Sequence, residues 1–207
     1  MQREDFTPDL FTSRKYSMSI LKANLVALVY PLPFVFLYVA GFLAVITLRT
    51  DLSGGISFTL GGNLIILLLN MLLFFAGFFL LIVLHEIIHA AVFLRGCELG
   101  RKSIVFGVKM ATPYCHCNEV LSVSVYRQSL LAPLWAICIP LAVLSYVTAN
   151  ILVFFITLVM ILGSGGDLAI FWMIRKFKGS NTFVWDMDDE VGCIIYEPLK
   201  PDGHGVK

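Results

Sequence analysis

The sequence predicts an α-helical membrane protein with about four transmembrane helices and a small cytoplasmic β-hairpin region. Of its 207 residues, 58% are hydrophobic and only 14% are charged, whereas globular chains carry roughly 25% charged residues. A mean hydropathy of +0.87 excludes a disordered chain, which needs low hydrophobicity and high charge. A net charge of +1 excludes a generally basic nucleic-acid-binding protein. We therefore expect the lipid bilayer as a partner, and no nucleic acid.

The first two spans are predicted from long runs without charge, because about 20 apolar residues cross a hydrocarbon core of about 30 Å. The run at 23–48 contains Pro31 and Pro33 near its start, which predict a bend of the kind that membrane helices tolerate. The run at 52–84 begins in glycine-rich loop sequence. We therefore expect the helix of the second span to begin near Asn63.

The third charge-free run, 128–166, is long enough for two helices, which we expect to be joined by a tight turn at 145–150. Fourteen Lys and Arg residues flank the four predicted spans on one side, and Arg49 alone lies on the other. Loops rich in Lys and Arg stay in the cytoplasm. We therefore expect both termini to be cytoplasmic in a multi-pass protein of the cell membrane.

This topology divides the chain into three parts. Residues 1–22 form a cytoplasmic N-terminal segment, which lies either on the membrane surface or in solvent as a leader. Residues 23–176 form a four-span membrane domain with a cytoplasmic hairpin at 96–127. Residues 177–207 form a cytoplasmic C-terminal tail.

Two polar segments have the β-branched, partly alternating pattern of hairpins. The first hairpin is predicted to pair residues 103–110 with residues 120–126 around Thr112-Pro113. In the tail, residues 183–185 and 191–196 flank an acidic turn and predict a second hairpin. The two hairpins together are compatible with one small sheet.

The strongest chemical signal is His85-Glu86-Ile87-Ile88-His89, an H-E-x-x-H motif near the cytoplasmic end of the second span, whose helix we expect to continue to about Arg95. One helical turn places both imidazoles on the same face, where they can bind one zinc ion, and Glu86 can act as general base toward an attacking water. Ionisable side chains in apolar surroundings usually mark function. The alternative is that the histidines are polar contacts between helices and that Glu86 pairs with Arg95.

A catalytic zinc usually has three protein ligands, and several residues are candidates for the third. The candidates are Asp167, the Cys115-His116-Cys117 cluster, Glu98 and Glu119. Of these, we expect Glu98 and Glu119 to be solvated. We interpret the five cysteines as reduced thiols, because Cys138 lies inside an apolar run.

Depth in the membrane favours Asp167. At 1.5 Å per residue, Asp167 lies about 12 Å inward of Arg175, while His89 and His85 lie about 9 and 15 Å inward of Arg95. The three side chains are therefore expected at one level. The neighbouring glycines 163, 165 and 166 are expected to let the fourth helix approach the second closely.

The sequence also resembles the bacterial membrane-bound putative zincin peptidases, relatives of the site-2 intramembrane proteases. The matching stretches are 85–90 (HEIIHA), 112–119 (TPYCHCNE), 126–133 (YRQSLLAP), 163–168 (GSGGDL), 184–186 (VWD) and 192–196 (GCIIY). The resemblance implies that His85 and His89 are zinc ligands, Glu86 is the general base and Asp167 is the third ligand. In contrast to site-2 proteases, which usually have an Asp-Gly pair, the glycines here precede Asp167.

We therefore expect a bacterial zinc metallopeptidase that hydrolyses peptide bonds of membrane or membrane-proximal substrates. Two other classes use the same residue types. A metal or proton transporter would spread its ionisable groups along a path and often contains inverted repeats. A noncatalytic scaffold would use them structurally and would tolerate Glu86→Gln.

Overall fold

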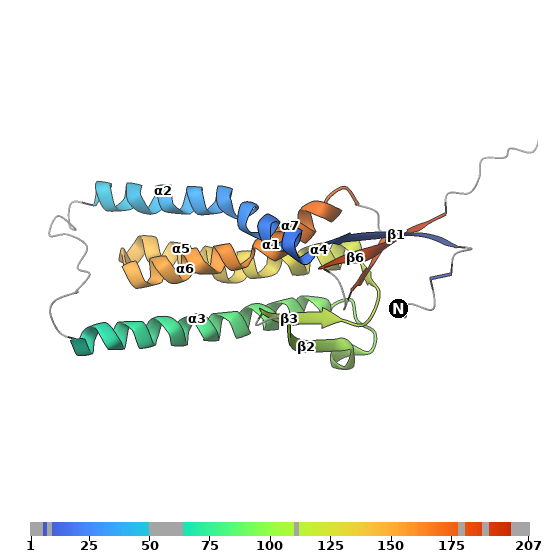
Figure 1. Ribbon diagram of the computed structural model, residues 1–207, viewed down its shortest axis with the longest axis horizontal. Coiled ribbons are helices and arrows are strands. Elements are labelled where there is room, and N and C mark those ends of the chain that lie inside the picture. Colours follow the sequence, from blue (N-terminus) through green and yellow to red (C-terminus); the bar gives the residue numbers. More distant parts are fainter. Residues whose placement is uncertain are drawn as a thin grey trace, which may run out of the picture.

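Four long apolar helical segments and a set of strands at one end make up the computed structural model. The structure describes residues 6–7, 10–49, 64–109, 112–177, 181–187 and 191–199. Within these ranges, four helical segments are long and apolar enough to cross a membrane: Leu21–Leu48, Leu64–Phe93, Val123–Thr148 and Ile151–Ile174. Figure 1 shows the strands gathered at one end of the helices. The prediction of four such segments is confirmed.

The first segment is broken where the prolines predict it. Helix α1 (Ile20–Val29) ends at Tyr30, and helix α2 (Leu32–Leu48) begins directly after Pro31, with Pro33 in its first turn. Proline is compatible with the first turn of a helix but lacks the N–H that would continue the preceding one. The predicted bend is thus a change from one helix to the next.

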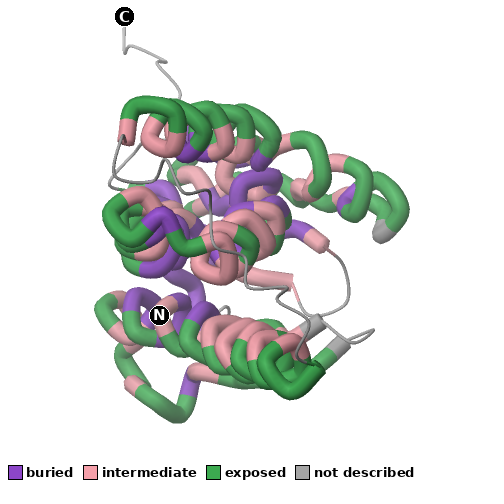
Figure 2. The backbone as a smooth tube through the Cα atoms, turned by 90° about the vertical axis from the view of Figure 1, so that its left-hand side faces the viewer, coloured by how far each residue is buried: buried purple, intermediate pink, exposed green. Residues whose placement is uncertain are grey.

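Helix α3 (Leu64–Phe93) is a single helix of 30 residues, about 45 Å long at 1.5 Å per residue. Its first described residue is Leu64, and the predicted start near Asn63 lies outside the described residues, as does the predicted glycine-rich loop before it. Figure 2 shows exposed faces on the outside of the helices and buried residues between them. The fully buried residues of α3 lie toward its C-terminal end: His85, His89, Ala90, Val92 and Phe93.

The third segment combines α4 (Val123–Pro133), the π-helical turn η4 (Leu134–Cys138) and α5 (Ile139–Thr148). Ala149 then adopts a left-handed conformation with φ of 50°, and the Asn150 side chain accepts hydrogen bonds from the first amides of the next helix at 2.9 and 3.1 Å. Such a residue pair ends one helix and caps the next. The predicted turn between the third and fourth segments is confirmed.

The fourth segment is also interrupted. Helix α6 (Ile151–Gly163) stops at Ser164, and helix α7 (Gly165–Ile174) follows at once. A Cβ atom on Gly165 would collide with the carbonyl group of Ala27, so this glycine lets α7 pack against α1. The glycines were expected to bring the fourth helix close to the second, and this expectation is wrong for Gly165.

The first predicted hairpin exists, but its second strand was placed incorrectly. Strand β2 (Ile104–Lys109), which follows the short helix η3 (Gly100–Ser103), pairs antiparallel with β3 (Thr112–Cys117). Residues 120–126 form only the short strand β4 (Leu121–Ser122) before α4 begins. The Ser122 hydroxyl accepts from the amide three residues later at 3.3 Å and so caps α4.

The other strands form a four-stranded antiparallel sheet in the order β1-β6-β5-β4. Strand β5 (Phe183–Asp186) pairs with β6 (Val191–Pro198), so the second predicted hairpin is confirmed. It does not join the first hairpin, which forms a separate two-stranded sheet. Instead β6 pairs with β1 (Phe11–Met18). The N-terminal segment was expected on the membrane surface or in solvent, without a strand; its residues Phe11–Met18 pair with β6, which the sequence did not predict.

A hydrophobic cluster joins the sheet to the ends of the helices. Buried side chains of α3, α4 and α7 meet those of β4, β5 and β6 there. Its members include Phe93, Tyr126, Ile174, Val184 and Ile195. Interiors of this kind are close-packed and deform little. The cluster therefore fixes the relative positions of α3, α4 and α7, the three helices that carry the polar residues described next.

Candidate metal centre

The two histidines of the H-E-x-x-H motif lie one turn apart on α3 and face the inside of the protein. His85 is 8% exposed and His89 is 6% exposed, and their ring centroids are 4.8 Å apart. The structure thus shows the same-face arrangement that the spacing predicts. Burial of two imidazoles is costly unless each has a polar partner or a ligand.

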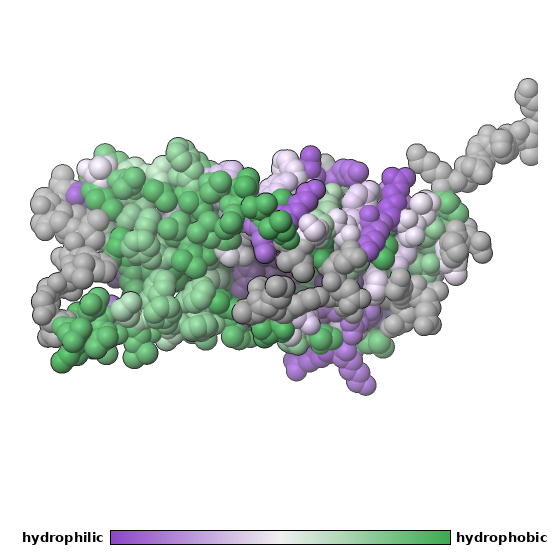
Figure 3. All heavy atoms as spheres, in the orientation of Figure 1, coloured by the Kyte–Doolittle hydropathy of each residue, from purple (hydrophilic) through white to green (hydrophobic). Residues whose placement is uncertain are grey.

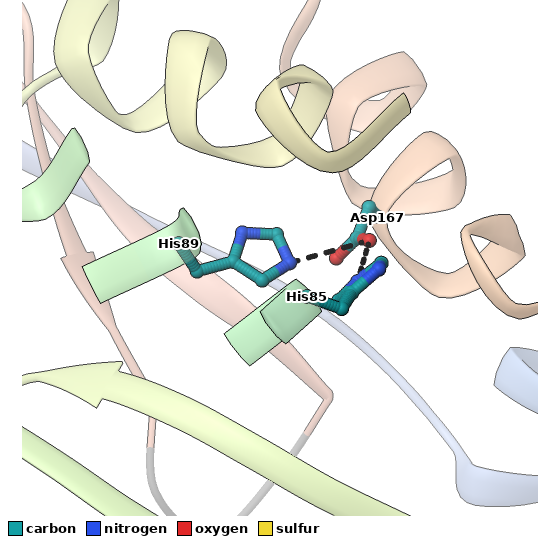
Figure 4. Close-up of side chains that lie close together, drawn as sticks. All are labelled: His85, His89 and Asp167. Carbon is teal, nitrogen blue, oxygen red and sulfur yellow. Dashed lines mark hydrogen bonds and ion pairs between the residues drawn. The ribbon is translucent and has the colours of Figure 1, made fainter. Parts of the chain in front are cut away.

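Asp167 supplies that partner from another helix. It lies in the first turn of α7, where the helix dipole favours a negative charge. Its Oδ2 atom is 3.1 Å from Nε2 of His85 and 3.4 Å from Nε2 of His89, as Figure 4 shows. The ligand atoms of the three residues lie within 4.8 Å of one another. In the described part of the chain, this is the one group of three or more such residues able to hold a metal ion.

Two of the three distances among these ligand atoms suit zinc. Two ligands about 2.0–2.1 Å from a tetrahedral zinc ion lie about 3.3 Å from each other, which is close to both nitrogen–oxygen distances. The donor set of two imidazoles and one carboxylate is also one that catalytic zinc uses. The residues therefore fit a zinc ion with one coordination position left for water or substrate.

Ser129 of α4 orients one of the two histidines. Its hydroxyl lies 3.2 Å from Nδ1 of His89 and donates to the His89 carbonyl oxygen at 3.4 Å. When the hydroxyl hydrogen points to the carbonyl, the serine oxygen can accept from Nδ1–H of His89. That tautomer leaves Nε2 available on the side of Asp167. Ser129 was not predicted as a site residue, because a single serine after Arg127 and Gln128 gives little signal.

Glu86 lies beside the three candidate ligands but is not one of them. It is half-buried, and its carboxylate interacts electrostatically with His85, His89 and Asp167. The backbone N–H of Cys115 in β3 donates a hydrogen bond to it. Strand β3 therefore lies next to the motif, a relationship that the sequence did not indicate.

The residues of the Cys115-His116-Cys117 cluster have other partners. Nδ1 of His116 is 3.1 Å from Asp186, and Sγ of Cys117 is 3.0 Å from Sγ of Cys97. Burial raises the pKa of Cys115 to about 12 and raises that of Cys117 further. The cluster does not converge on the histidines of α3.

Glu119 was expected to be solvated, and this expectation is wrong. It is 1% exposed and accepts hydrogen bonds from the Ser103 hydroxyl and from the amides of Glu98 and Leu99 at 2.9 and 3.0 Å. Burial alone would raise its pKa, but these three donors outweigh burial and hold the pKa at about 2. Glu119 thus secures the loop after α3, while Glu98 is exposed.

Comparison with known proteins gives one family. A family model described as "Putative zincin peptidase" matches residues 78–181, half of the chain. The matched region contains His85, Glu86, His89 and Asp167, together with the hairpin β2–β3 and Ser129. No curated protein and no solved structure matches the chain.

Proposed function

This chain belongs to the putative zincin peptidase family, and we propose that it is a zinc-dependent metallopeptidase of the cell membrane that hydrolyses peptide bonds of membrane or membrane-proximal proteins. One observation carries the proposal. Two imidazole nitrogens and the Asp167 carboxylate converge within 4.8 Å, and the carboxylate of Glu86 lies beside them. This is the constellation that metal-assisted hydrolysis requires.

The surface of the helices supports insertion in a membrane. Large apolar side chains on α3 are more than half exposed, for example Leu72 at 64% and Leu80 at 69%. Figure 3 shows a continuous apolar surface over the helices, with hydrophilic residues toward the end that carries the strands. Soluble monomers rarely expose apolar patches of such extent. In a bilayer this surface faces lipid, and His85, His89 and Asp167 lie near the boundary with the strand-bearing end.

His85, His89 and Asp167 are the residues that would hold zinc. When bound, zinc supplies Lewis-acid polarisation of the scissile carbonyl and of the attacking water. The side chain of Asp167 is 19% exposed and those of the histidines are 10% and 8% exposed. The site is therefore buried enough to strengthen its electrostatic interactions and open enough on the Asp167 side for water to enter.

Glu86 is the residue that moves the proton. As general base it accepts a proton from the attacking water, and as general acid it delivers that proton to the leaving amine. The Cys115 N–H orients its carboxylate. Ser129 would favour the His89 tautomer with its proton on Nδ1, because its hydroxyl lies 3.2 Å from that nitrogen.

Strand β3 is the element best placed to hold the substrate backbone. In the described part of the chain β3 pairs with β2 on one side, and on the other side its Cys115 N–H reaches Glu86. A transmembrane substrate must unwind before its carbonyl groups become accessible. An unwound segment that pairs with the open side of β3 would lie beside Glu86 as an added strand.

The test compares wild type with Glu86→Gln, and with Glu98→Gln as a matched control because Glu98 is exposed. Each is expressed at the same level in a host lacking the native protein, and uncleaved membrane proteins are quantified. We expect substrates to accumulate in Glu86→Gln alone, with zinc content unchanged in all three, because Glu86 moves a proton and does not hold the metal.

Two results would contradict the peptidase. Equal cleavage patterns in wild type and zinc-loaded Glu86→Gln would assign the motif a structural role. Zinc or proton flux in proteoliposomes, together with unchanged membrane proteins, would assign it to transport.

A further inference from the structure

A second polar site lies near the C-terminal end of α7, separate from the candidate metal centre. A hollow of about 600 Å³ is lined by Arg127 of α4 and by Phe171, Arg175 and Lys176. Arg175 follows Asp167 by eight residues, which is about 12 Å along a helix. The cationic residues of α7 that line the hollow are therefore more than two turns from Asp167, whereas Phe171 is about one turn from it.

The lining carries three positive charges, and no carboxylate lines it among the described residues. One guanidinium nitrogen of Arg127 donates to the Phe177 carbonyl oxygen at 3.3 Å, and its guanidinium carbon is 5.0 Å from the Phe171 ring centroid. Its Nε is buried without a hydrogen-bond acceptor in the described part of the chain. A buried donor of this kind is costly unless an acceptor reaches it. Arg127 therefore has capacity to bind an anion.

Aromatic rings contact the other two cations. The guanidinium of Arg175 lies 3.9 Å from the Trp172 ring and donates to the Trp172 carbonyl oxygen at 2.8 Å. The ammonium of Lys176 lies 5.4 Å from the Tyr16 ring. Cation–π contacts orient a cation without neutralising it. The three side chains thus present positive charge at one place, although Lys176 also lines a neighbouring hollow with Arg14 and Glu197.

The surroundings of the hollow favour an amphiphilic anion over a soluble anion as its ligand. Trp172 is 47% exposed and contacts the Tyr30 ring at 5.9 Å, and amphipathic aromatic residues of this kind gather at membrane interfaces. Leu25 and Leu28 of the adjacent α1 are 59% and 62% exposed. Figure 3 shows hydrophilic residues meeting the apolar surface of the helices near the strand-bearing end. A ligand with an anionic headgroup and apolar chains matches the cationic hollow and the apolar surface beside it.

We propose that the hollow between α4 and α7 binds the phosphate headgroup of an anionic phospholipid, with its acyl chains on the apolar surface beside Trp172. The inference rests on the membrane insertion proposed above, but not on the peptidase activity. Basic pockets between helices at the cytoplasmic boundary are the sites where anionic headgroups bind. Free phosphate shares the headgroup chemistry but has no part that would use the apolar surface.

The test titrates the purified full-length protein, in a neutral detergent, with phosphatidylglycerol, phosphatidylcholine or inorganic phosphate, and native mass spectrometry counts bound molecules. Arg175→Gln/Lys176→Gln removes two exposed charges of the hollow. Arg101→Gln/Lys102→Gln, on exposed residues of η3 that do not line the hollow, is the matched control. We expect wild type and control to bind phosphatidylglycerol in preference to phosphatidylcholine. The hollow variant should bind phosphatidylglycerol about 25-fold more weakly, at about fivefold for each charge.

Arg127→Gln provides a second measurement, with thermal unfolding recorded to show that the variant is folded. A folded Arg127→Gln with weakened phosphatidylglycerol binding supports the site. Equal binding of both lipids, or equal loss in the η3 control, would overturn it. Binding of inorganic phosphate as tight as that of phosphatidylglycerol, lost in the same variants, would overturn the lipid assignment and leave a phosphate site. Cleavage measured with Glu86→Gln is independent of all these outcomes.

Discussion

The hydroxyl of Ser129 lies 3.2 Å from Nδ1 of His89 and donates to the carbonyl oxygen of the same residue. A residue of α4 therefore contacts Nδ1 of His89, while Nε2 of the same ring faces Asp167. Partners of this kind orient a metal-binding histidine and raise its basicity. Ser129 is a positioning residue in this scheme, since it contacts neither substrate nor zinc.

The first prediction is that Ser129→Ala weakens zinc binding by about 10- to 100-fold. Without the serine oxygen, His89 can place its proton on Nε2, where Asp167 accepts it, and that tautomer cannot bind zinc through Nε2. Competition with a chelator measures the affinity, and nitrogen NMR of the metal-free protein reports the tautomer. Ser124→Ala on the exposed face of the same helix is the control. Unchanged zinc affinity in folded Ser129→Ala would contradict the role.

The sequence predicts the parts of this site that depend on local spacing or on depth. His85 and His89 share a face because they are four residues apart, and Asp167 is at their level because its distance from Arg175 is comparable. Ser129 and the Cys115 N–H reach the site through the crossing of α4 and β3 with α3, which no local pattern encodes. Their roles therefore become visible only in the structure.

The errors in the fold have a related cause. Residues 120–126 are β-branched and alternate in part, but from Val123 onward they belong to α4, whose buried residues Val123, Tyr126 and Leu130 follow the helical period. Strand β1 is mostly exposed, so its polar sequence resembles a solvated leader. Its place is set by backbone pairing with β6, and side-chain patterns carry little information about backbone partners.

The second prediction concerns the third ligand. Wild type should bind about one zinc ion per chain. Asp167→Ala should lose zinc affinity and proteolysis together. The loss should exceed the roughly 100-fold expected when a residue is removed that contacts a zinc ligand but not the zinc itself. Asp167→Asn should keep the fold and bind more weakly through a neutral oxygen. Metal analysis measures the bound zinc, and cleavage of an accumulated substrate measures the proteolysis.

Replacing Cys115 and Cys117 together with serine is the matched comparison. In the proposed site neither thiol reaches the metal, so zinc content should stay nearly constant. If the serine variant lost zinc and Asp167→Ala retained it, the third zinc ligand would be a residue of β3. That result would contradict the argument from membrane depth.

The third prediction is the topology. The strands lie at one end of the helices (Figure 1), and fourteen of fifteen Lys and Arg residues flank that side in the sequence. A cysteine introduced at the exposed Lys102 should react with an impermeant maleimide only after cells are permeabilised. A cysteine at Ser53 should react in intact cells. Both are made with Cys97 and Cys115 changed to serine, and the reverse labelling pattern would contradict cytoplasmic termini.

The fourth prediction concerns Glu119, whose pKa is held at about 2 by the Ser103 hydroxyl and two amides despite burial. The folded pKa lies below the usual value of 4.5, so the carboxylate stabilises the folded state fully above about pH 4.5. That stabilisation decreases as the pH falls from about 4.5 toward 2, because protons then bind preferentially to the unfolded chain. Glu119→Gln should lower the free energy of unfolding by roughly 3 kcal/mol at pH 7.

The difference between wild type and Glu119→Gln should therefore shrink as the pH is lowered through this window. Thermal unfolding in detergent at several pH values measures it, with Glu98→Gln as the exposed control. Because the loop after α3 leads into β2 and β3, the variant should also expose Cys97, whose thiol lies 3.0 Å from that of Cys117, to alkylation. A pH-independent difference would mean that Glu119 stabilises the loop through packing and not through its charge.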